Sequence, residues 1–328
     1  MPRKLPLAHV PTPLFRHDAL DRLVGTALWI KRDDMTAGAE AGNKIRKLEY
    51  LLGDALERGA TTVITCGGVQ SNHARATALC CARFGLRSLL LLRTPQPDEP
   101  QTVHGNLLLD RLAGAEVRFI LPAQYQNRSE LMSDVQRELD EQGQNAYVIP
   151  EGGSDGLGAL GYVDAMQEVR AQLDLGLGGG PTPFDAVAHA CGSGGTAAGV
   201  VLGAARWSVA KQVYAMAVCD DRAYFESRIG AIVAHARTLD HSLSSTAELS
   251  VFDSWKGPGY GVASAEQLAF IREVASTTGL VLDPVYTGKA LFALSRLTPK
   301  PARVLFIHTG GLPGLLAEAA AFGDVLRS

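Results

Sequence analysis

The feature of this chain that most constrains its fold is a repeated order of short apolar runs and amphipathic stretches, which extends over most of its 328 residues. Apolar runs with little alternation of polar residues are typical of strands that are buried on both faces of a parallel sheet. The amphipathic stretches between them are typical of helices that cover such a sheet. The sequence therefore predicts an α/β fold. Strands are expected at residues 61–65, 88–92, 117–121, 146–149, 186–190, 213–218 and 304–307.

Two helices can be predicted together with their ends. Residues 45–56 place isoleucine and leucine side chains at helical spacing. Residues 74–84 end before Gly85, which suits the left-handed position that follows a helix. The length of the chain exceeds that of one ordinary core, so we expect two domains or one core with an inserted lobe.

Composition limits the partners and the compartment. With a net charge of -3, the chain has no basic surface for nucleic acid or for an anionic membrane, and no apolar run is long enough to span a bilayer. The five cysteines form no CxxC pair, and the first residues lack a secretory signal. We therefore expect reduced thiols, no metal site and a cytoplasmic protein that binds any anion at a local site.

Chemistry in such folds concentrates where a strand turns into the next helix. At Gly42-Asn43-Lys44, a glycine and an asparagine suit a sharp turn, and the helical stretch begins directly after them. The dipole of a helix disfavours a cation in the first turn. Lys44 is therefore badly placed for a solvated lysine and well placed for one converted to an imine, although a surface lysine remains the alternative.

Two more turns are suited to anions. After the strand at 61–65, Ser71 and Asn72 supply a hydroxyl and an amide at a helix start, either to grip a carboxylate or as a helix cap. After the strand at 186–190, residues 191–196 form a run of small residues whose N–H groups and hydroxyls suit a phosphate. This run matches neither a Walker loop nor a dinucleotide fingerprint.

Two tyrosines lie in turns near the C-terminal end. Tyr286 follows Asp283-Pro284, and Tyr260 is flanked by glycines and a proline rather than by apolar partners. Either ring is suited to stack on a flat ligand or to exchange a proton. A phosphate-bearing aldehyde cofactor explains the lysine, the phosphate turn and the tyrosines together. The alternative from another class is a nucleotide-dependent oxidoreductase that uses residues 191–196 for phosphate.

With these motifs in this order, the chain resembles the D-cysteine desulfhydrase / 1-aminocyclopropane-1-carboxylate deaminase family of fold-type-II, tryptophan-synthase-β-like, pyridoxal-phosphate enzymes. The resemblance runs nearly from end to end. The matching segments are 11–14, 30–34, 42–49, 70–73, 152–154, 158–162, 282–286 and 308–311.

The resemblance implies a role for each matching residue. Lys44 would form the Schiff base with pyridoxal 5'-phosphate. Ser71, Asn72 and His73 would lie beside the cofactor and the substrate carboxylate, and Tyr260 would face the substrate. Tyr286 would stack near the cofactor ring. The phosphate would be held by Gly192, Ser193, Gly194, Gly195 and Thr196.

The resemblance also implies the architecture and the assembly. Two open, twisted, mainly parallel sheets flanked by helices are expected. A smaller domain at 48–160 would be inserted into a larger cofactor-binding domain made of 1–47 and 161–328. A homodimer is implied as well.

Three positions favour the desulfhydrase branch. Thr287 and Thr309 stand where the deaminases have glutamate and leucine, and His73 stands where they have glutamine. Neutral hydroxyls near the cofactor ring give a weaker electron sink than a carboxylate, which is sufficient when a thiol leaves from Cβ. We therefore expect α,β-elimination of D-cysteine to pyruvate, sulfide and ammonia. Cysteate, chloroalanine and serine, or ring opening of 1-aminocyclopropane-1-carboxylate, remain alternatives.

Three features depart from the family pattern. Ala41 replaces the first of two glycines before Asn43, Glu151 adds a carboxylate before the motif at 152–154, and residues 222–249 match no specific pattern. Each bears on the choice of substrate.

Overall fold

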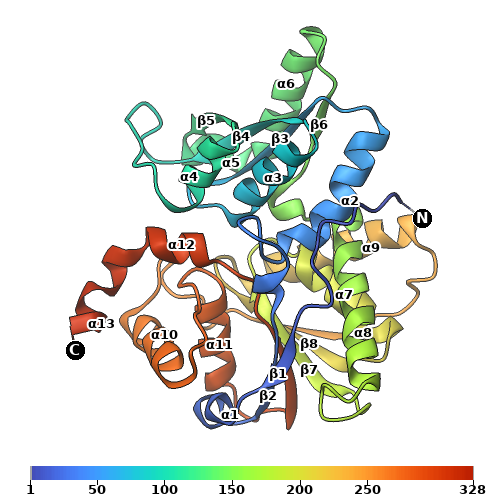
Figure 1. Cartoon of the computed structure of the whole chain (residues 1–328), viewed down its shortest axis with the longest axis vertical. Helices are drawn as coiled ribbons and strands as arrows, with labels where there is room; N and C mark the ends of the chain where they lie inside the picture. The colour runs from blue at the N-terminus through green and yellow to red at the C-terminus, as the bar shows by residue number, and fades with distance from the viewer. Residues whose placement is uncertain (1, 328) are drawn as a thin grey trace.

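The structure, a computed structural model, describes residues 2–327 and contains two sheets (Figure 1). From edge to edge, the larger sheet consists of β1 (Leu14–Arg16), β2 (Ala27–Lys31), β10 (Arg303–Ile307), β7 (Phe184–Cys191), β8 (Ala210–Ala217) and β9 (Glu248–Phe252). The smaller sheet consists of β5 (Glu116–Ile120), β4 (Arg87–Arg93), β3 (Thr62–Gly68) and β6 (Ala146–Val148). Neighbouring strands are parallel except β1, which is antiparallel to β2. The predicted α/β fold with two mainly parallel sheets is confirmed.

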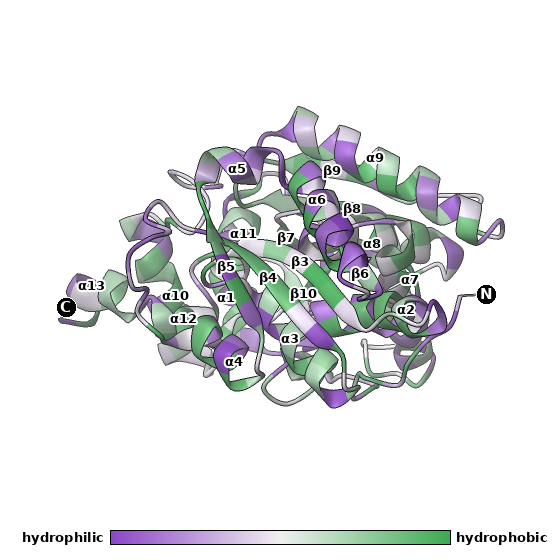
Figure 2. Cartoon of the chain, turned by 90° about the horizontal axis from the view of Figure 1, so that it is seen from above, coloured by the Kyte–Doolittle hydropathy of each residue, from purple (hydrophilic) through white to green (hydrophobic). Residues whose placement is uncertain are grey.

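The helices lie between the strands in the predicted order. They are α1 (Asp18–Val24), α2 (Lys44–Glu57), α3 (Asn72–Arg83), α4 (Gly105–Leu112), α5 (Pro122–Gln126), α6 (Arg128–Glu141), α7 (Gly156–Asp174), α8 (Gly195–Arg206), α9 (Arg222–Leu239), α10 (Ala265–Thr278), α11 (Thr287–Arg296), α12 (Leu312–Ala317) and α13 (Gly323–Arg327), with 3-10 turns η1 (Asp33–Met35), η2 (Glu151–Gly153) and η3 (Ala319–Phe322). Seen from above in Figure 2, α9 at the rim carries both hydrophilic and hydrophobic residues, whereas β3 and β4 are largely hydrophobic.

Each predicted strand overlaps an observed one, but β1, β2 and β9 were missed. β1 is only three residues long and gives too short a pattern to detect. β9 is an edge strand with an exposed glutamate and a serine, so it lacks a continuous apolar run. Gly85 has a φ of 68°, as predicted for the residue after the second helix, although α3 starts two residues earlier than expected.

Helix α7 fixes the position of α2, because the two pack unusually closely. A Cβ atom added at Gly161 of α7 would lie 2.0 Å from the carbonyl oxygen of Arg46 in α2. Only glycine permits this approach. Since Lys44 is the first residue of α2, this close packing also fixes where Lys44 emerges.

The predicted division into domains remains a prediction. All strands of the smaller sheet lie between residues 48 and 160, and both expected boundaries fall within helices, α2 and α7.

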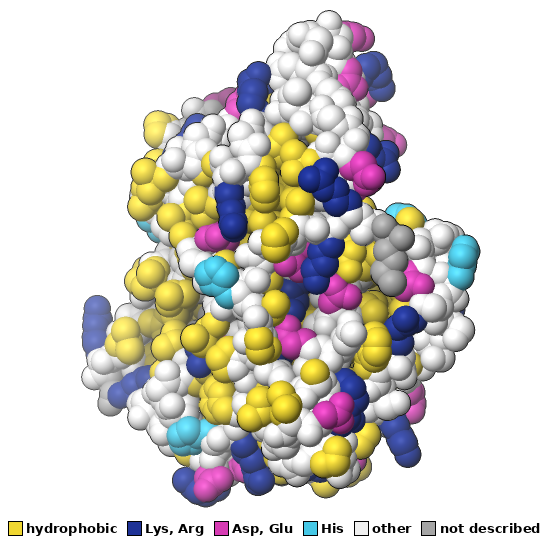
Figure 3. All heavy atoms as spheres, turned by 45° about the vertical axis from the view of Figure 1, so that its right-hand side comes forward, with side chains coloured by type: hydrophobic (Ala, Val, Ile, Leu, Met, Phe, Trp, Pro, Cys, Tyr) yellow, Lys and Arg dark blue, Asp and Glu magenta, His cyan; other side chains and the backbone are white. Residues whose placement is uncertain are grey.

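On the face drawn in Figure 3, charged side chains of both signs are interspersed. The five cysteines are free, and all but Cys219 are buried. Among the helices of residues 2–327, none has the length and apolarity needed to cross a membrane.

Candidate active site

A cavity of about 520 Å³ lies where the carboxyl ends of strands from both sheets meet. This is the edge at which parallel α/β folds bind their ligands. The smaller sheet contributes the residues after β3, the end of β4 and the start of η2, and the larger sheet contributes the residues after β7, β8 and β10. The cavity is lined by these predicted site residues: Lys44, Ser71, Asn72, His73, Gly192, Ser193, Gly194, Thr196, Tyr260, Tyr286 and Thr309.

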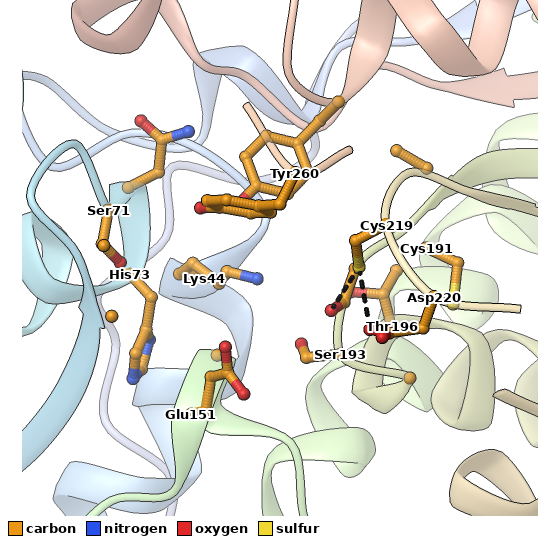
Figure 4. Close-up of a pocket in the computed structure, with 18 of the residues that line it drawn as sticks. Lys44, Ser71, His73, Glu151, Cys191, Ser193, Thr196, Cys219, Asp220 and Tyr260 are labelled. Carbon is orange, nitrogen blue, oxygen red and sulfur yellow. Dashed lines mark hydrogen bonds between the residues drawn. The ribbon is translucent and has the colours of Figure 1, made fainter. Parts of the chain in front are cut away.

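Lys44 extends into the middle of this cavity. Figure 4 shows it between Ser71 and His73 on one side and Ser193 on the other. Burial lowers the pKa of Lys44 to about 8, although the carboxylate of Glu151 opposes this change. About a tenth of the amine is therefore uncharged at pH 7, and the uncharged form is the one that a nucleophile toward an aldehyde requires.

The turn after β7 has the geometry of a phosphate site. Helix α8 begins at Gly195, and its N-cap Gly194 has no side chain to bond the first N–H groups of the helix. A Cβ atom on Gly195 would lie 2.6 Å from Ser154 Oγ and 2.8 Å from Lys47 Nζ, so a larger residue would fill the space. Thr196 Oγ1 accepts a hydrogen bond of 3.0 Å from Asn43 Nδ2, which joins this turn to the turn that carries Lys44.

Lys47, beside this turn, was missed by the sequence analysis. It is 1% exposed and donates hydrogen bonds to the carbonyl oxygen of Gly152 at 3.0 Å and to Ser154 Oγ at 3.3 Å. Within residues 2–327, no carboxylate lies within ion-pairing distance of it. Burial and the nearby Lys44 cation hold its pKa well below the usual value. A phosphate bound at Gly195 would supply the missing negative charge, so these residues fit a phosphate-bearing cofactor.

The turn after β3 serves as a helix cap and also faces the cavity. Ser71 is the N-cap of α3, and its Oγ accepts a hydrogen bond of 3.1 Å from the N–H of Ala74. Asn72 Oδ1 accepts a bond of 3.0 Å from Asn106 Nδ2. The cap is thus observed, whereas the grip on a carboxylate remains a prediction, which the structure permits because a capping side chain leaves other N–H groups of the first turn available.

His73 is a neutral imidazole with a defined tautomer. Its Nε2 lies 3.0 Å from Thr65 Oγ1, and that hydroxyl donates its proton to the carbonyl oxygen of Ile149 at 2.8 Å. Nε2 must therefore be the donor, which leaves Nδ1 as an acceptor. Nδ1 is buried and has no partner among the described residues. Burial and the two neighbouring lysine cations, Lys44 and Lys47, hold the pKa of His73 far below its usual value.

Tyr260 and Tyr286 form a pair at the opposite wall. Their hydroxyl oxygens are 2.8 Å apart, and their rings meet edge to face with centroids 6.1 Å apart. Burial and the neighbouring Tyr260 raise the pKa of Tyr286 well above its usual value. Both phenols are therefore protonated at neutral pH, and one of the two protons is left to donate to a ligand.

Two predicted residues lie behind the cavity wall. Gly195 and Thr287 do not line the cavity, although their neighbours do. The hydroxyl of Thr287, which is fully buried, donates to Asp283 Oδ1 at 2.6 Å and accepts from the N–H of Asp283 at 2.9 Å. Its hydrogen is thus already used within the protein. Direct contact of Thr287 with the cofactor remains a prediction, whereas Thr309 does reach the cavity.

The mouth of the cavity holds a group of residues that the sequence analysis did not bring together. The hydroxyl of Tyr125 donates to Glu151, and Arg128 Nε lies 2.8 Å from Glu151 Oε2. The guanidinium of Arg93 lies over the rings of Tyr125 and Tyr260. The signal in the sequence was limited to Glu151 and Tyr260, because Arg93, Tyr125 and Arg128 come from other elements and meet these residues only in the folded chain.

Comparison with known proteins agrees with this geometry. The model of the pyridoxal-phosphate dependent enzyme family matches residues 5–310. The mitochondrial bifunctional D-cysteine desulfhydrase/1-aminocyclopropane-1-carboxylate deaminase of Arabidopsis thaliana is 42% identical over 94% of this chain and 78% of its own length. The D-cysteine desulfhydrase of Klebsiella pneumoniae is 37% identical over 96% and 95%. A crystal structure of an ACC deaminase homologue superposes with a TM-score of 0.87 and 35% identity, over 98% and 95%.

Proposed function

The chain belongs to the family of pyridoxal-phosphate-dependent enzymes, and from this premise we propose that it catalyses α,β-elimination of a small β-substituted amino acid. D-cysteine is the first candidate substrate, with pyruvate, sulfide and ammonia as products. The observation that carries the proposal is the partly uncharged Lys44 amine in a cavity that also contains a phosphate turn. The alternative of a nucleotide-dependent oxidoreductase is set aside, because the family uses pyridoxal phosphate.

The residues of the cavity can be assigned to parts of the cofactor. Pyridoxal phosphate, when bound, supplies an electron sink for the charge that develops at the substrate Cα. Lys44 would hold its aldehyde carbon. Lys47 and the N–H groups at the start of α8 would hold the phosphate. Tyr286, whose ring lies against Gly192 of the phosphate turn, would lie along the cofactor ring.

Lys44 is the better candidate for moving the α-proton. Its Nζ, with a pKa lowered to about 8, can accept a proton near neutral pH. Tyr286 is a poor base, because its pKa is raised well above the usual value. The Tyr260–Tyr286 pair is better suited to donate a proton to the departing group.

Substrate orientation would depend on the turn after β3. The N–H groups at the start of α3, with Ser71 and Asn72, are placed to bind the α-carboxylate. His73 Nδ1 offers a neutral acceptor for a donor of the ligand. A neutral imidazole avoids a third buried cation beside Lys44 and Lys47.

The choice of substrate rests on the neutral groups near the cofactor. Thr309 lines the cavity with a hydroxyl rather than a carboxylate, and Thr287, behind the wall, adds no carboxylate there, which supports departure of a good leaving group over ring opening. The names of the relatives include both reactions. Opening of 1-aminocyclopropane-1-carboxylate is therefore the second candidate, and cysteate, chloroalanine and serine are further substrates for elimination.

A Lys44→Ala variant tests the proposal. It should lose at least about 100-fold of the rate of pyruvate formation, because the base is removed. It should also lose the visible cofactor absorbance that borohydride fixes. Lys211→Ala, at an exposed lysine of β8, should retain both. Sulfide and pyruvate from D-cysteine support the desulfhydrase assignment. Formation of 2-oxobutyrate from the cyclopropane substrate, without sulfide from D-cysteine, would overturn it.

We also propose a cytoplasmic homodimer with the two domains expected from the sequence. Free thiols support a reducing compartment. Light scattering of the purified protein tests the assembly, since a single monomeric mass would contradict it.

A further inference from the structure

Arg93 is a cation of the cavity wall that the proposed function does not use. It is the last residue of β4, pairs with Gly68 of β3 in the parallel ladder, and lines the cavity. Among the described residues, its guanidinium forms neither an ion pair nor a hydrogen bond. Its contacts are aromatic, with the guanidinium carbon 4.5 Å from the ring centroid of Tyr125 and 5.2 Å from that of Tyr260.

Arg128, in the same wall of the cavity, is an arginine whose charge is paired with a carboxylate. Its Nε is 2.8 Å from Glu151, and the hydroxyl of Tyr125 donates to the same carboxylate. Glu151 is therefore held by Arg128 and Tyr125, and among the described residues it forms no ion pair with Arg93. Arg93 is left as a positive charge with no carboxylate of its own.

Contact with two rings limits how the guanidinium can move. A guanidinium over an aromatic face is attracted by the ring and keeps the N–H groups at its edge free. These N–H groups match two oxygens of an oxyanion in a bidentate geometry. Arg93 is thus oriented by Tyr125 and Tyr260 for an anion that enters the cavity.

The position of Arg93 relative to the other anion sites indicates which part of a substrate it would meet. Ser71 and Asn72 follow β3, and Arg93 ends β4, the strand paired with β3, at the same edge of the sheet. Tyr260, which contacts Arg93, is hydrogen-bonded to Tyr286. A substrate held by its α-carboxylate after β3 and reacting beside Tyr286 would leave its β-substituent to Tyr260 and Arg93.

We infer that Arg93 is an anion subsite for the β-substituent, so that the enzyme takes amino acids whose β-substituent carries an oxyanion such as a sulfonate. The inference rests on the proposed elimination. With cysteate, the proton of Cα passes to the base, and the Cβ–S bond breaks with its electron pair remaining on sulfur. Water then hydrolyses the enamine product. Cysteate and water give pyruvate, ammonium and hydrogen sulfite, and no oxidant or reductant is required.

The test compares an anionic with an uncharged β-substituent. We would measure kcat/KM for pyruvate formation from cysteate and from 3-chloroalanine, each in D and L forms. Arg93→Met should lower the value for cysteate by about 10- to 100-fold, the size of a hydrogen bond to a charged group. The value for 3-chloroalanine should change by less than about threefold. Arg93→Lys, which keeps the charge, should recover part of the loss.

A matched control is available on the same strand. Arg87, at the other end of β4, has a side chain that is 61% exposed and lies outside the cavity. Arg87→Gln should leave kcat/KM for both substrates unchanged. Equal losses on both substrates in Arg93→Met would assign Arg93 to the α-carboxylate or to folding, and would overturn the inference. An unchanged rate with cysteate would overturn it as well.

A binding measurement separates this inference from the proposed function. Titration of the holoenzyme with cysteate, followed by the visible spectrum of the cofactor, gives a Kd that requires no turnover. If the wild type binds cysteate, releases no pyruvate from any substrate, and Arg93→Met binds at least about 10-fold more weakly, the subsite stands and the elimination fails. If the wild type turns over 3-chloroalanine but neither binds nor converts cysteate, the elimination stands and the subsite fails.

Discussion

Helix α2 contributes residues to two groups of ionisable side chains whose charges are balanced in opposite ways. The first, which we call the paired cluster, consists of Lys31, Asp33, Arg46 and Glu168 and contains two charges of each sign. Arg46 lies 2.8 Å from Asp33 and 2.9 Å from Glu168, which also pairs with Lys31. Burial alone would raise the pKa of Asp33, but Arg46 outweighs it and holds this pKa below its usual range.

The second group, the open cluster, consists of Lys44, Lys47 and His73; Lys44 and His73 line the cavity, and Lys47 lies beside the phosphate turn. Burial lowers the pKa of all of them, and the two lysines have no carboxylate within ion-pairing distance in the described part of the chain. The comparison separates charges that stabilise the fold from charges that are available to bind a ligand. The paired cluster is complete within the protein, whereas the open cluster needs an anion from a ligand to be balanced.

The largest effect is expected from breaking the paired cluster. Arg46→Met leaves Asp33 and Glu168 buried without their main partner and should lower the free energy of unfolding by about 3–5 kcal/mol. Urea denaturation measures this loss. Arg58→Ala, at the C-cap of the same helix, where the side chain is 68% exposed, should cost less than about 1 kcal/mol. Similar costs for the two variants would show that the paired cluster is not structural.

Lys47→Met should behave in the opposite way. Without cofactor, replacing an unbalanced buried cation by an apolar side chain should cost less than about 1 kcal/mol or stabilise the protein. With cofactor, the loss of a charged phosphate contact should raise the Kd for pyridoxal phosphate by about 10- to 100-fold. Denaturation of the cofactor-free protein and a cofactor titration measure both. A strong loss of stability with an unchanged Kd for pyridoxal phosphate would show that Lys47 stabilises the fold rather than binding the cofactor.

Lys289 adds a third case to the comparison of buried charges. In the described part of the chain it has no paired carboxylate, but its ammonium protons all have acceptors. Its Nζ donates to the carbonyl oxygens of Val218 at 3.3 Å, Lys256 at 2.7 Å and Gly259 at 2.8 Å. Lys289→Met leaves these carbonyls unpaired and should cost about 1–3 kcal/mol in unfolding experiments.

Because Gly259 precedes Tyr260, the Lys289→Met variant should also raise KM more than it lowers kcat. Lys289→Arg, which retains the charge and the donors, should restore part of both quantities. A loss of stability with an unchanged KM would limit Lys289 to a role in folding.

The last effect is the pH dependence of the stability of the cofactor-free protein. The pKa of Lys44 is about 8 in the folded state and about 10.4 in an unfolded chain. Between these values the unfolded state binds more protons, so stability rises with pH through this window and is lost as pH falls through about 8. The urea midpoint measured from pH 7 to 10 should rise less in Lys44→Met than in the wild type. Equal slopes would contradict the lowered pKa.

The sequence predicted the strands with continuous apolar runs and missed those that are short or at an edge. It identified Lys44, the phosphate turn and both tyrosines, because each lies in a turn with a local signal of glycine, proline or a small residue. It missed Lys47 and Arg93. Lys47 is adjacent to Lys44 on one helical face, but only the packing of α2 against η2 and α8 shows that it faces the phosphate turn.

By itself, the sequence determined the α/β class and the pyridoxal-phosphate family, and it predicted the lysine that would meet the cofactor and the ligand of the turn after β7. These properties depend on residues that are neighbours along the chain. Only the tertiary structure decided which charges are balanced. Glu168, the partner of Arg46, lies 122 positions away in the sequence, and the rings that contact Arg93 come from helix α5 and from the distant turn at Tyr260. Coulombic energy depends on distance in space, and folding sets that distance.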